Sequence, residues 1–262
     1  MIDVTVQPAP TNTLQEVSVA AHFRAPWPVG VMELADLVRH FSDYPIVQQL
    51  PRLQPATLPQ FGKPQMAFEV NVASADLPRI LLRSPDLRHT IQLQGDRLVV
   101  GWSRIEPLGA PAAYPGFDAM LVKWTGILSR FETWTDGHFS WRPEHRLGEV
   151  SYANVAPLER DGQQKRISDI FSFSQIGGRA LDMMSMNWTE RLYSDEESAV
   201  RPKGMVVASV GLGQAPPAIP VLAFNFAGVA SVANNQQTER ILSEIHTRIR
   251  EIYQSTVVQD AH

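Results

Sequence analysis

The stretch IQLQGDRLVVGW, residues 91–102, decides the fold of this chain. Apolar and polar residues alternate from Ile91 to Gln94, the pair Gly95-Asp96 interrupts them, and the alternation resumes as far as Trp102. A period of two is typical of a strand with one buried face, and a Gly-Asp pair is typical of a tight hairpin turn. The stretch therefore predicts an antiparallel hairpin with an unusually polar second face.

The segments before this hairpin predict a strand, a helix and a connector. Residues 17–23 alternate with period two, whereas residues 31–41 carry apolar side chains at helical spacing. Residues 45–65 contain five prolines, which remove backbone donors, so we expect an extended connector or a sheet edge there. Residues 66–72 then predict a strand, and a loop is expected from there to Pro85.

The segments after the hairpin predict a helix, several strands and a final helix. A broad apolar stripe predicts a helix over residues 117–134, and an amphipathic pattern predicts one over 238–253. Between them, β-branched and aromatic runs separated by Gly, Pro and Asp predict strands at 148–158, 167–176, 182–193, 205–213 and 221–230.

This order lacks the regular strand–helix alternation of a parallel α/β sheet. It predicts an α+β fold: a largely antiparallel curved sheet with two internal helices and a long C-terminal helix packed on it. We expect a single domain over residues 1–262, with a two-part organisation at 1–160 and 161–262 as the alternative.

Composition excludes several classes of protein. The net charge of −4 argues against non-specific nucleic-acid binding, which needs a clustered excess of cations; the densest cationic stretches, around Arg79, Arg83 and Arg88, are sparse. The absence of cysteine excludes disulfides, thiol catalysis and cysteine-based metal sites. The N-terminus lacks the basic and apolar regions of a signal peptide, and no apolar run approaches the ~18 residues of a membrane span, so we expect a cytoplasmic protein.

The sequence carries no catalytic or metal-binding signature. The densest group of potential ligands, Asp136, His138, Glu144 and His145, lacks the helical spacing of a metalloprotease motif and is interpreted as a polar loop. No G-x-S-x-G elbow is present, and the glycine pairs fit strand turns rather than phosphate loops. We therefore predict no metal and no cofactor, although paired carboxylates from distant segments would leave no local pattern.

Two other arrangements stay open. Arg97, Trp102 and Arg104 could line a groove, since arginine recognises anions and stacks on aromatic rings. Alternatively, a curved sheet around the C-terminal helix would form an apolar pocket, lined by Trp102, Trp188, Phe224 and Phe226.

Several motifs together resemble a sporadically distributed bacterial protein family of unknown function and of similar length. Its members show a V-Q-L-Q-x-D-R-x-x-x-N-W strand pair, a Y-P-x-Y/F segment and a strand with Y-x-N-H. The matching positions here are Gln92, Gln94, Asp96, Arg97, Trp102, Tyr114, Pro115, Tyr152 and Asn154. Gly101 stands where the family has Asn, and Val155 where it has His, so a mechanism built on that histidine would be lost.

The resemblance implies no reaction; the family's patchy occurrence implies a defence or mobile-element context. We therefore expect a non-enzymatic protein that binds a partner encoded nearby. The alternatives are a binder of small molecules or lipids with its pocket between sheet and last helix, and a hydrolase or transferase that uses Asp96, Arg97, Tyr152 and Asn154. The candidate binding residues are Gln92, Gln94, Arg97, Trp102, Arg104, Tyr152 and Asn154. The many strands also predict exposed sheet edges that a homodimer would pair.

Overall fold

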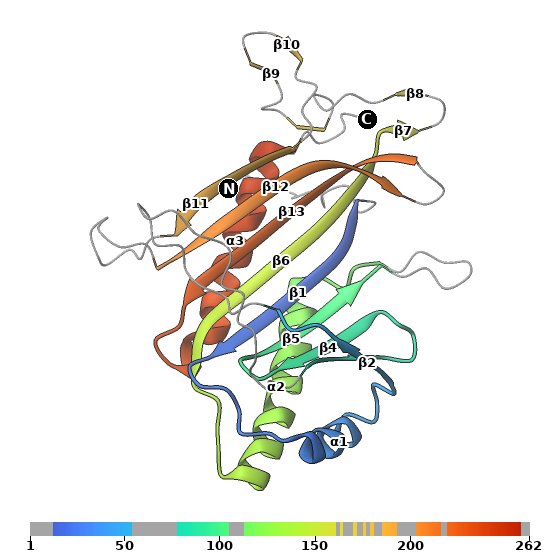
Figure 1. Cartoon of the computed structure of the whole chain (residues 1–262). Coiled ribbons are helices and arrows are strands. Elements are labelled where there is room, and N and C mark those ends of the chain that lie inside the picture. The colour runs from blue at the N-terminus through green and yellow to red at the C-terminus, as the bar shows by residue number, and fades with distance from the viewer. Residues whose placement is uncertain are drawn as a thin grey trace, which may run out of the picture.

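The computed structural model describes residues 13–53, 78–104, 113–160, 163–164, 170–171, 175–176, 179–180, 185–192, 203–215 and 219–257. Within these residues the main element is a nine-stranded sheet in which all neighbouring strands are antiparallel (Figure 1). Three α-helices accompany it, one of them at the C-terminal end of the chain. The predicted α+β class and the antiparallel sheet are confirmed.

The strands of the sheet are β1 (Leu14–Phe23), β2 (Ile46–Leu50), β3 (Arg79–Arg83), β4 (His89–Gln94), β5 (Arg97–Ser103), β6 (His145–Pro157), β11 (Ser185–Leu192), β12 (Gly204–Ala215) and β13 (Ile219–Ser231). The helices are α1 (Val31–His40), α2 (Phe117–Phe139) and α3 (Thr238–Thr256), preceded by the short 3-10 helix η2 (Asn235–Gln237). Two short hairpins lie outside the sheet: β7 (Glu159–Arg160) with β8 (Gln163–Gln164), and β9 (Gln175–Ile176) with β10 (Arg179–Ala180).

The strands β1 and β6 form the centre of the sheet, with three strands beyond β6 and four beyond β1. The sheet runs β11-β12-β13-β6-β1-β5-β4-β3-β2. The first strand of each half, β1 or β6, pairs with the last strand of that half, β5 or β13, and a helix follows that last strand. Residues 14–139 and 145–256 therefore each contribute one side of a shared sheet and one long helix. The predicted single domain and its two-part alternative stay predictions.

One face of the sheet forms the core beneath the helices. In β1 the alternating residues Val17, Val19 and Ala21 are at most 1% exposed, as the period-two pattern predicts. Helix α2 contributes its apolar stripe, including Trp124 and Phe131, and α3 contributes its isoleucines. Figure 1 shows α2 and α3 behind the sheet, each behind one half of it. Burial of these two stripes holds both helices on the same face.

Two glycines allow α3 to approach the sheet closely. A Cβ at Gly148 of β6 would lie 3.3 Å from a methyl of Leu242, and a Cβ at Gly228 of β13 would overlap Cγ2 of Ile245. Side chains at these positions would push the helix away, because native cores have no spare volume. The glycines therefore set the distance between α3 and the two strands.

The structure corrects two predicted loops. The loop expected before Pro85 contains β3, and residues 135–139, expected within a polar loop, form the last turns of α2. The strand predicted at 66–72 and most of the one at 167–176 lie outside the described residues. The other predicted strands correspond to β1, β4, β5, β6, β11, β12 and β13.

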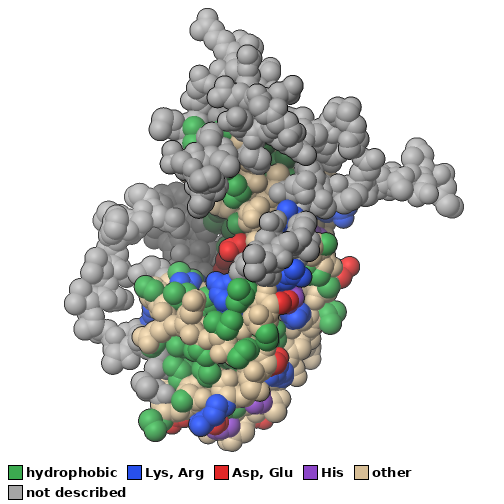
Figure 2. All heavy atoms as spheres, turned by 90° about the vertical axis from the view of Figure 1, so that its right-hand side faces the viewer, with side chains coloured by type: hydrophobic (Ala, Val, Ile, Leu, Met, Phe, Trp, Pro, Cys, Tyr) green, Lys and Arg blue, Asp and Glu red, His purple; other side chains and the backbone are tan. Residues whose placement is uncertain are grey.

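The side of the molecule that carries α1 and β2 is partly apolar. Figure 2 views this side and shows hydrophobic side chains gathered on its lower part. Met32 of α1 is 82% exposed, and Val47 of the edge strand β2 is 47% exposed. The homodimer expected from the sheet edges stays a prediction. No helix in the described part of the chain is long and apolar enough to cross a membrane.

Candidate functional site

A row of polar and small side chains crosses five strands on the face opposite the helices. The register places Ser151 of β6 opposite Ser18 of β1, Ser18 opposite Gly101 of β5, Gly101 opposite Thr90 of β4, and Thr90 opposite Arg83 of β3. Residues opposite one another in neighbouring strands project from the same face of a sheet. These five positions, far apart in sequence, therefore form one line across the sheet.

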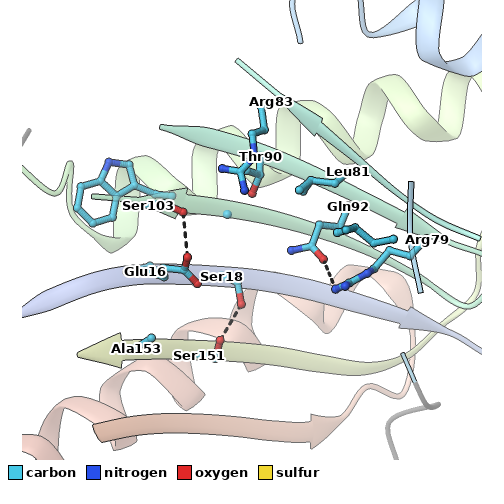
Figure 3. Close-up of a pocket in the computed structure, with 14 residues that line it drawn as sticks. Glu16, Ser18, Arg79, Leu81, Arg83, Thr90, Gln92, Ser103, Ser151 and Ala153 are labelled. Carbon is cyan, nitrogen blue, oxygen red and sulfur yellow. Dashed lines mark hydrogen bonds between the residues drawn. The ribbon is translucent and has the colours of Figure 1, made fainter. Parts of the chain in front are cut away.

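This row forms the floor of a cavity of about 230 Å³ (Figure 3). Its polar lining consists of Glu16, Ser18, Arg79, Arg83, Thr90, Gln92, Ser103 and Ser151. Leu50 and Leu81 add apolar surface. The volume suits a small molecule or one side chain of a partner, since larger ligand pockets run from ~300 to 1,000 Å³.

Several polar groups in the cavity have partners within the site. Ser18 and Ser151 share a hydrogen bond of 2.7 Å between their hydroxyls. An NH1 proton of Arg79 is donated to Oε1 of Gln92 at 3.0 Å, and the Ser103 hydroxyl lies 3.5 Å from Oε1 of Glu16 (Figure 3).

Other groups in the cavity have no partner among the described residues. Arg83 forms no ion pair or hydrogen bond with them, and Nε of Arg79 is buried without an acceptor. Thr90 is 5% exposed, yet its hydroxyl, which faces the cavity, makes no hydrogen bond to the described chain. Buried polar groups in native proteins normally find partners, so Nε of Arg79 is a buried donor available to a ligand. The side chains of Arg83 and Thr90 add donors that border the cavity.

Gly101 keeps the floor of the cavity open. A Cβ at this position would lie 2.5 Å from Oγ1 of Thr90, closer than real Cβ atoms approach an oxygen. Any other residue here would displace the threonine and fill the space between Ser18 and Thr90.

The groups that line the cavity are suited to recognising an anion. Guanidinium groups and hydroxyls bind carboxylates and phosphates through charge-assisted hydrogen bonds. The serine nearest a carboxylate, Ser103, is 3.5 Å from Glu16, and no histidine is among the described residues that line the cavity. A serine needs an adjacent, well-oriented base to become a nucleophile, and Glu16 at this distance does not provide one.

The predicted residues Gln94 and Arg97 lie on the same face as the cavity, but they bond to other residues of the protein and not to the cavity. Oε1 of Gln94 accepts from the Leu53 amide at 2.8 Å, and its Nε2 donates to the Leu53 carbonyl at 2.9 Å. Arg97 is 6% exposed and pairs with Asp96 at 3.2 Å. Burial alone would raise the pKa of Asp96, but the hydrogen bond and charge of Arg97 keep that pKa below its usual value. The polar side chains at the Gly95–Asp96 end of this face therefore bond to groups of the protein itself.

Replacing Gln94 by alanine should destabilise the protein by about 1–3 kcal/mol, because this 1% exposed side chain makes two hydrogen bonds to the Leu53 backbone and one to Asp96. Gln92 is the matched control: it is two residues away on the same strand face, half-buried, with one hydrogen bond to Arg79. Urea denaturation should show a smaller loss for Gln92→Ala than for Gln94→Ala. Equal losses would contradict the distinction between a structural and a ligand-facing glutamine.

The predicted residues Trp102, Tyr152 and Asn154 project from the opposite, helix-covered face. The Trp102 ring is 2% exposed and packs 5.3 Å from the Tyr114 ring, although the residue also borders the cavity from β5. The Tyr152 hydroxyl lies 2.6 Å from Nδ1 of His246, and Asn154 donates to the Phe224 carbonyl at 3.4 Å. Tyr152 and Asn154 therefore help to hold α3 and β13 against β6.

The ionisable groups of this buried cluster are neutral. Burial raises the pKa of Tyr152, and it raises the pKa of Tyr114 to about 12. Burial, assisted by Arg250, lowers the pKa of His246 to about 4. At neutral pH the phenol therefore keeps its proton and the imidazole is uncharged, and the hydrogen bond between them joins α3 to β6.

The residues of the hydrolase hypothesis do not converge on one cleft. Asp96 and Arg97 lie at the hairpin end of β5 on the cavity side of the sheet, where Arg97 is opposite His22. Tyr152 and Asn154 lie on the helix side, where Tyr152 is opposite Val17, five residues along β1. The remaining predicted residue, Arg104, is half-buried beyond the end of β5, and its backbone donates to Gln15.

The aromatic residues predicted to line an apolar pocket pack against one another. Phe224 and Phe226 are at most 1% exposed and contact each other and Tyr253 at 5.8–6.3 Å. Trp188 packs 6.2 Å from Phe226, whereas Trp102 belongs to the other half of the core. The cavity described above lies on the other side of the sheet from Phe224, Phe226 and Trp188.

The cluster considered for metal binding is dispersed. Asp136 pairs with Arg142 at 2.7 Å, His138 with Asp36 at 3.0 Å, Glu144 with Arg24 at 3.8 Å, and Nδ1 of His145 with Thr238 at 2.7 Å. Within the described ranges, no three His, Asp or Glu side chains are arranged to hold a metal ion.

Sequence reasoning found Gln92 but missed most of the cavity. Thr90, Arg79, Arg83, Ser18 and Ser151 were not predicted as site residues. One pattern in the sequence could have identified Thr90: it continues the alternation of polar residues formed by Gln94 and Gln92. The partners on β1, β3 and β6 depend on strand pairing, which no local pattern reveals.

Comparison with protein-family models gave no matching family, and comparison with curated proteins gave no match. The resemblance to the bacterial family therefore stays a prediction.

Proposed function

We propose that this is a non-enzymatic binding protein that holds a protein partner on the sheet face opposite the helices. The observation that carries the proposal is the cavity on that face, in which Arg83, Thr90 and Nε of Arg79 have no partner among the described residues. An antiparallel sheet can turn one polar face to water, but on this face Nε of Arg79 is buried without an acceptor, and buried donors normally have partners.

The neighbouring strands extend this face with a surface suited to a partner. Asn187, Thr189 and Asn225 are exposed there, and Val207 and Ala227 are half-buried between them. Mixed apolar and small polar surface is typical of interfaces that form and dissociate. The small side chains also leave the sheet accessible to a partner's backbone or side chains.

A photo-crosslinking experiment tests which face binds. Benzoylphenylalanine is introduced at Asn225, which is exposed on the cavity face, and separately at Val122, which is 74% exposed on α2. In cells that naturally make the protein, position 225 should give a discrete adduct with one protein, and position 122 should not.

The adduct is then identified and its partner purified to measure affinity. Wild-type and Val122-substituted protein should bind this partner equally. Adducts of equal yield from both positions, or adducts only from position 122, would overturn the assignment of the binding face.

A further inference from the structure

We propose that the cavity binds an oxyanion group, a carboxylate or a phosphate, at its β3 end. This inference rests on the proposed function, because it names the chemical group that the binding face accepts. It stands on four described features: two guanidinium groups, a buried hydroxyl, an open floor and the position of the one carboxylate in the lining.

The two arginines supply the positive charge. Arg79 and Arg83 lie at the two ends of β3, four residues apart. Because side chains alternate between the two faces of a strand, both project from the cavity face. Arg79 gives one proton to Gln92 and keeps Nε unpartnered, and Arg83 has no partner among the described residues. Guanidinium groups with free donors are the side chains best suited to oxygen anions.

Thr90 and Gly101 supply a neutral donor and the space for the ligand. Thr90 is opposite Arg83 on the neighbouring strand, and Figure 3 shows the two side chains close together. The Thr90 hydroxyl is therefore placed to donate to an oxygen held by Arg83. Gly101 is opposite Thr90 on its other side, and its missing side chain leaves room for the rest of the ligand.

Glu16 sets the orientation of the ligand. It lies on β1, three strands from Arg83, which corresponds to a backbone separation of ~14 Å. An anionic group is therefore repelled from the β1 end and attracted to the β3 end. Between the two ends, the hydroxyls of Ser18, Ser103 and Ser151 can bond to a polar body.

Nuclear magnetic resonance titration with inorganic phosphate, and separately with acetate, tests the proposal at constant ionic strength held by chloride. The backbone amides of Thr90, Gly101 and Arg83 in the wild-type protein should shift saturably with at least one of the two anions. Arg83→Gln should weaken that binding by about tenfold or more, because it removes a charge-assisted hydrogen bond. Gly101→Ala should weaken it as well, by filling the floor.

Arg39→Gln is the matched control. It makes the same change of charge on α1, where Arg39 is 75% exposed and lies 3.5 Å from Asp36, outside the cavity lining. Its affinity for the anion should equal that of wild type. Absence of saturable shifts with both anions, or equal weakening in Arg39→Gln and Arg83→Gln, would overturn the proposal.

The photo-crosslinking experiment shows whether the anion belongs to the protein partner or is a free small molecule. It also distinguishes failure of the oxyanion site from failure of the protein-binding function. If the anion comes from the partner's own acidic group, phosphate or acetate should reduce the adduct from position 225; if it is a free small molecule, the adduct should persist. Adducts without any anion binding would overturn only the oxyanion site. Anion binding without adducts would support the site and overturn the protein-binding function.

Discussion

Replacing Gly228 by valine is expected to destabilise the protein by about 3 kcal/mol or more, the upper range for overpacking a core. Gly228 lies on β13 beneath α3, where a Cβ would overlap Cγ2 of Ile245 and lie 3.4 Å from Ile249 and Val206. Strand and helix are both fixed by other contacts, so neither can move away freely. Guanidinium denaturation followed by circular dichroism measures the loss.

Gly213→Val provides the control for this substitution. Gly213 lies on β12, is exposed, and its nearest neighbour would be a Val221 methyl 3.6 Å from the new Cβ. Because that is an ordinary contact and valine suits a strand, the free energy of unfolding should change by less than about 0.5 kcal/mol. Similar losses for the two variants would contradict the close packing of α3 on β13.

The second large effect is a loss of stability in mild acid. Burial lowers the pKa of His145 to about 4, and burial with the charge of Arg250 lowers that of His246 to about 4, from an ordinary 6.5. The unfolded chain therefore binds protons first, and stability falls as the pH drops from about 6.5 toward 4. A shift of this size corresponds to roughly 3 kcal/mol for the fully buried His145, and to less for the partly exposed His246.

Other acidic groups limit the window in which this effect is measured. Burial raises the pKa of Glu132, whose carboxylate lies 3.9 Å from Nε2 of His145, so its protonation offsets part of the loss. Asp36, Asp43 and Asp96 have lowered pKa values and lose their contribution only at more acidic pH. The comparison is therefore made between about pH 7 and pH 5.

Urea denaturation at these two pH values should show a clear loss for wild type. His145→Gln and His246→Gln should each flatten the pH dependence, whatever their stability at neutral pH. A wild-type stability that is unchanged between the two values would refute the assignment of buried, neutral histidines.

The strands β1, β4 and β5 were predictable because polar and apolar residues alternate in their sequences. The structure nevertheless buries both faces of β5 and of the second half of β1, including Ala20 and His22, so the alternation marked strands rather than an exposed face. Strand β3 was missed because its middle residues, Ile80, Leu81 and Leu82, are all at most 6% exposed, so its sequence shows an apolar run without a period. Periodicity alone does not identify such a short run as a strand, because a segment of buried helix shows the same pattern.

The candidate site was less predictable, for two physical reasons. The motif Y-x-N correctly places Tyr152 and Asn154 on one face, but pairing with Val17 of β1 puts that face under the helices. Gln92 and Gln94 share the other face, yet Leu53 covers Gln94 and leaves Gln92 in the cavity. Register and long-range contacts, rather than residue type, decide which polar side chains meet a ligand.

The central claim is that the sheet face opposite the helices binds the partner. Its most direct test is the yield of photo-adducts from position 225 relative to that from position 122. Both positions are exposed, and they lie on opposite sides of the sheet. We predict a discrete adduct from position 225 and none from position 122. A partner captured mainly from position 122 would place binding on the helical side and contradict this account.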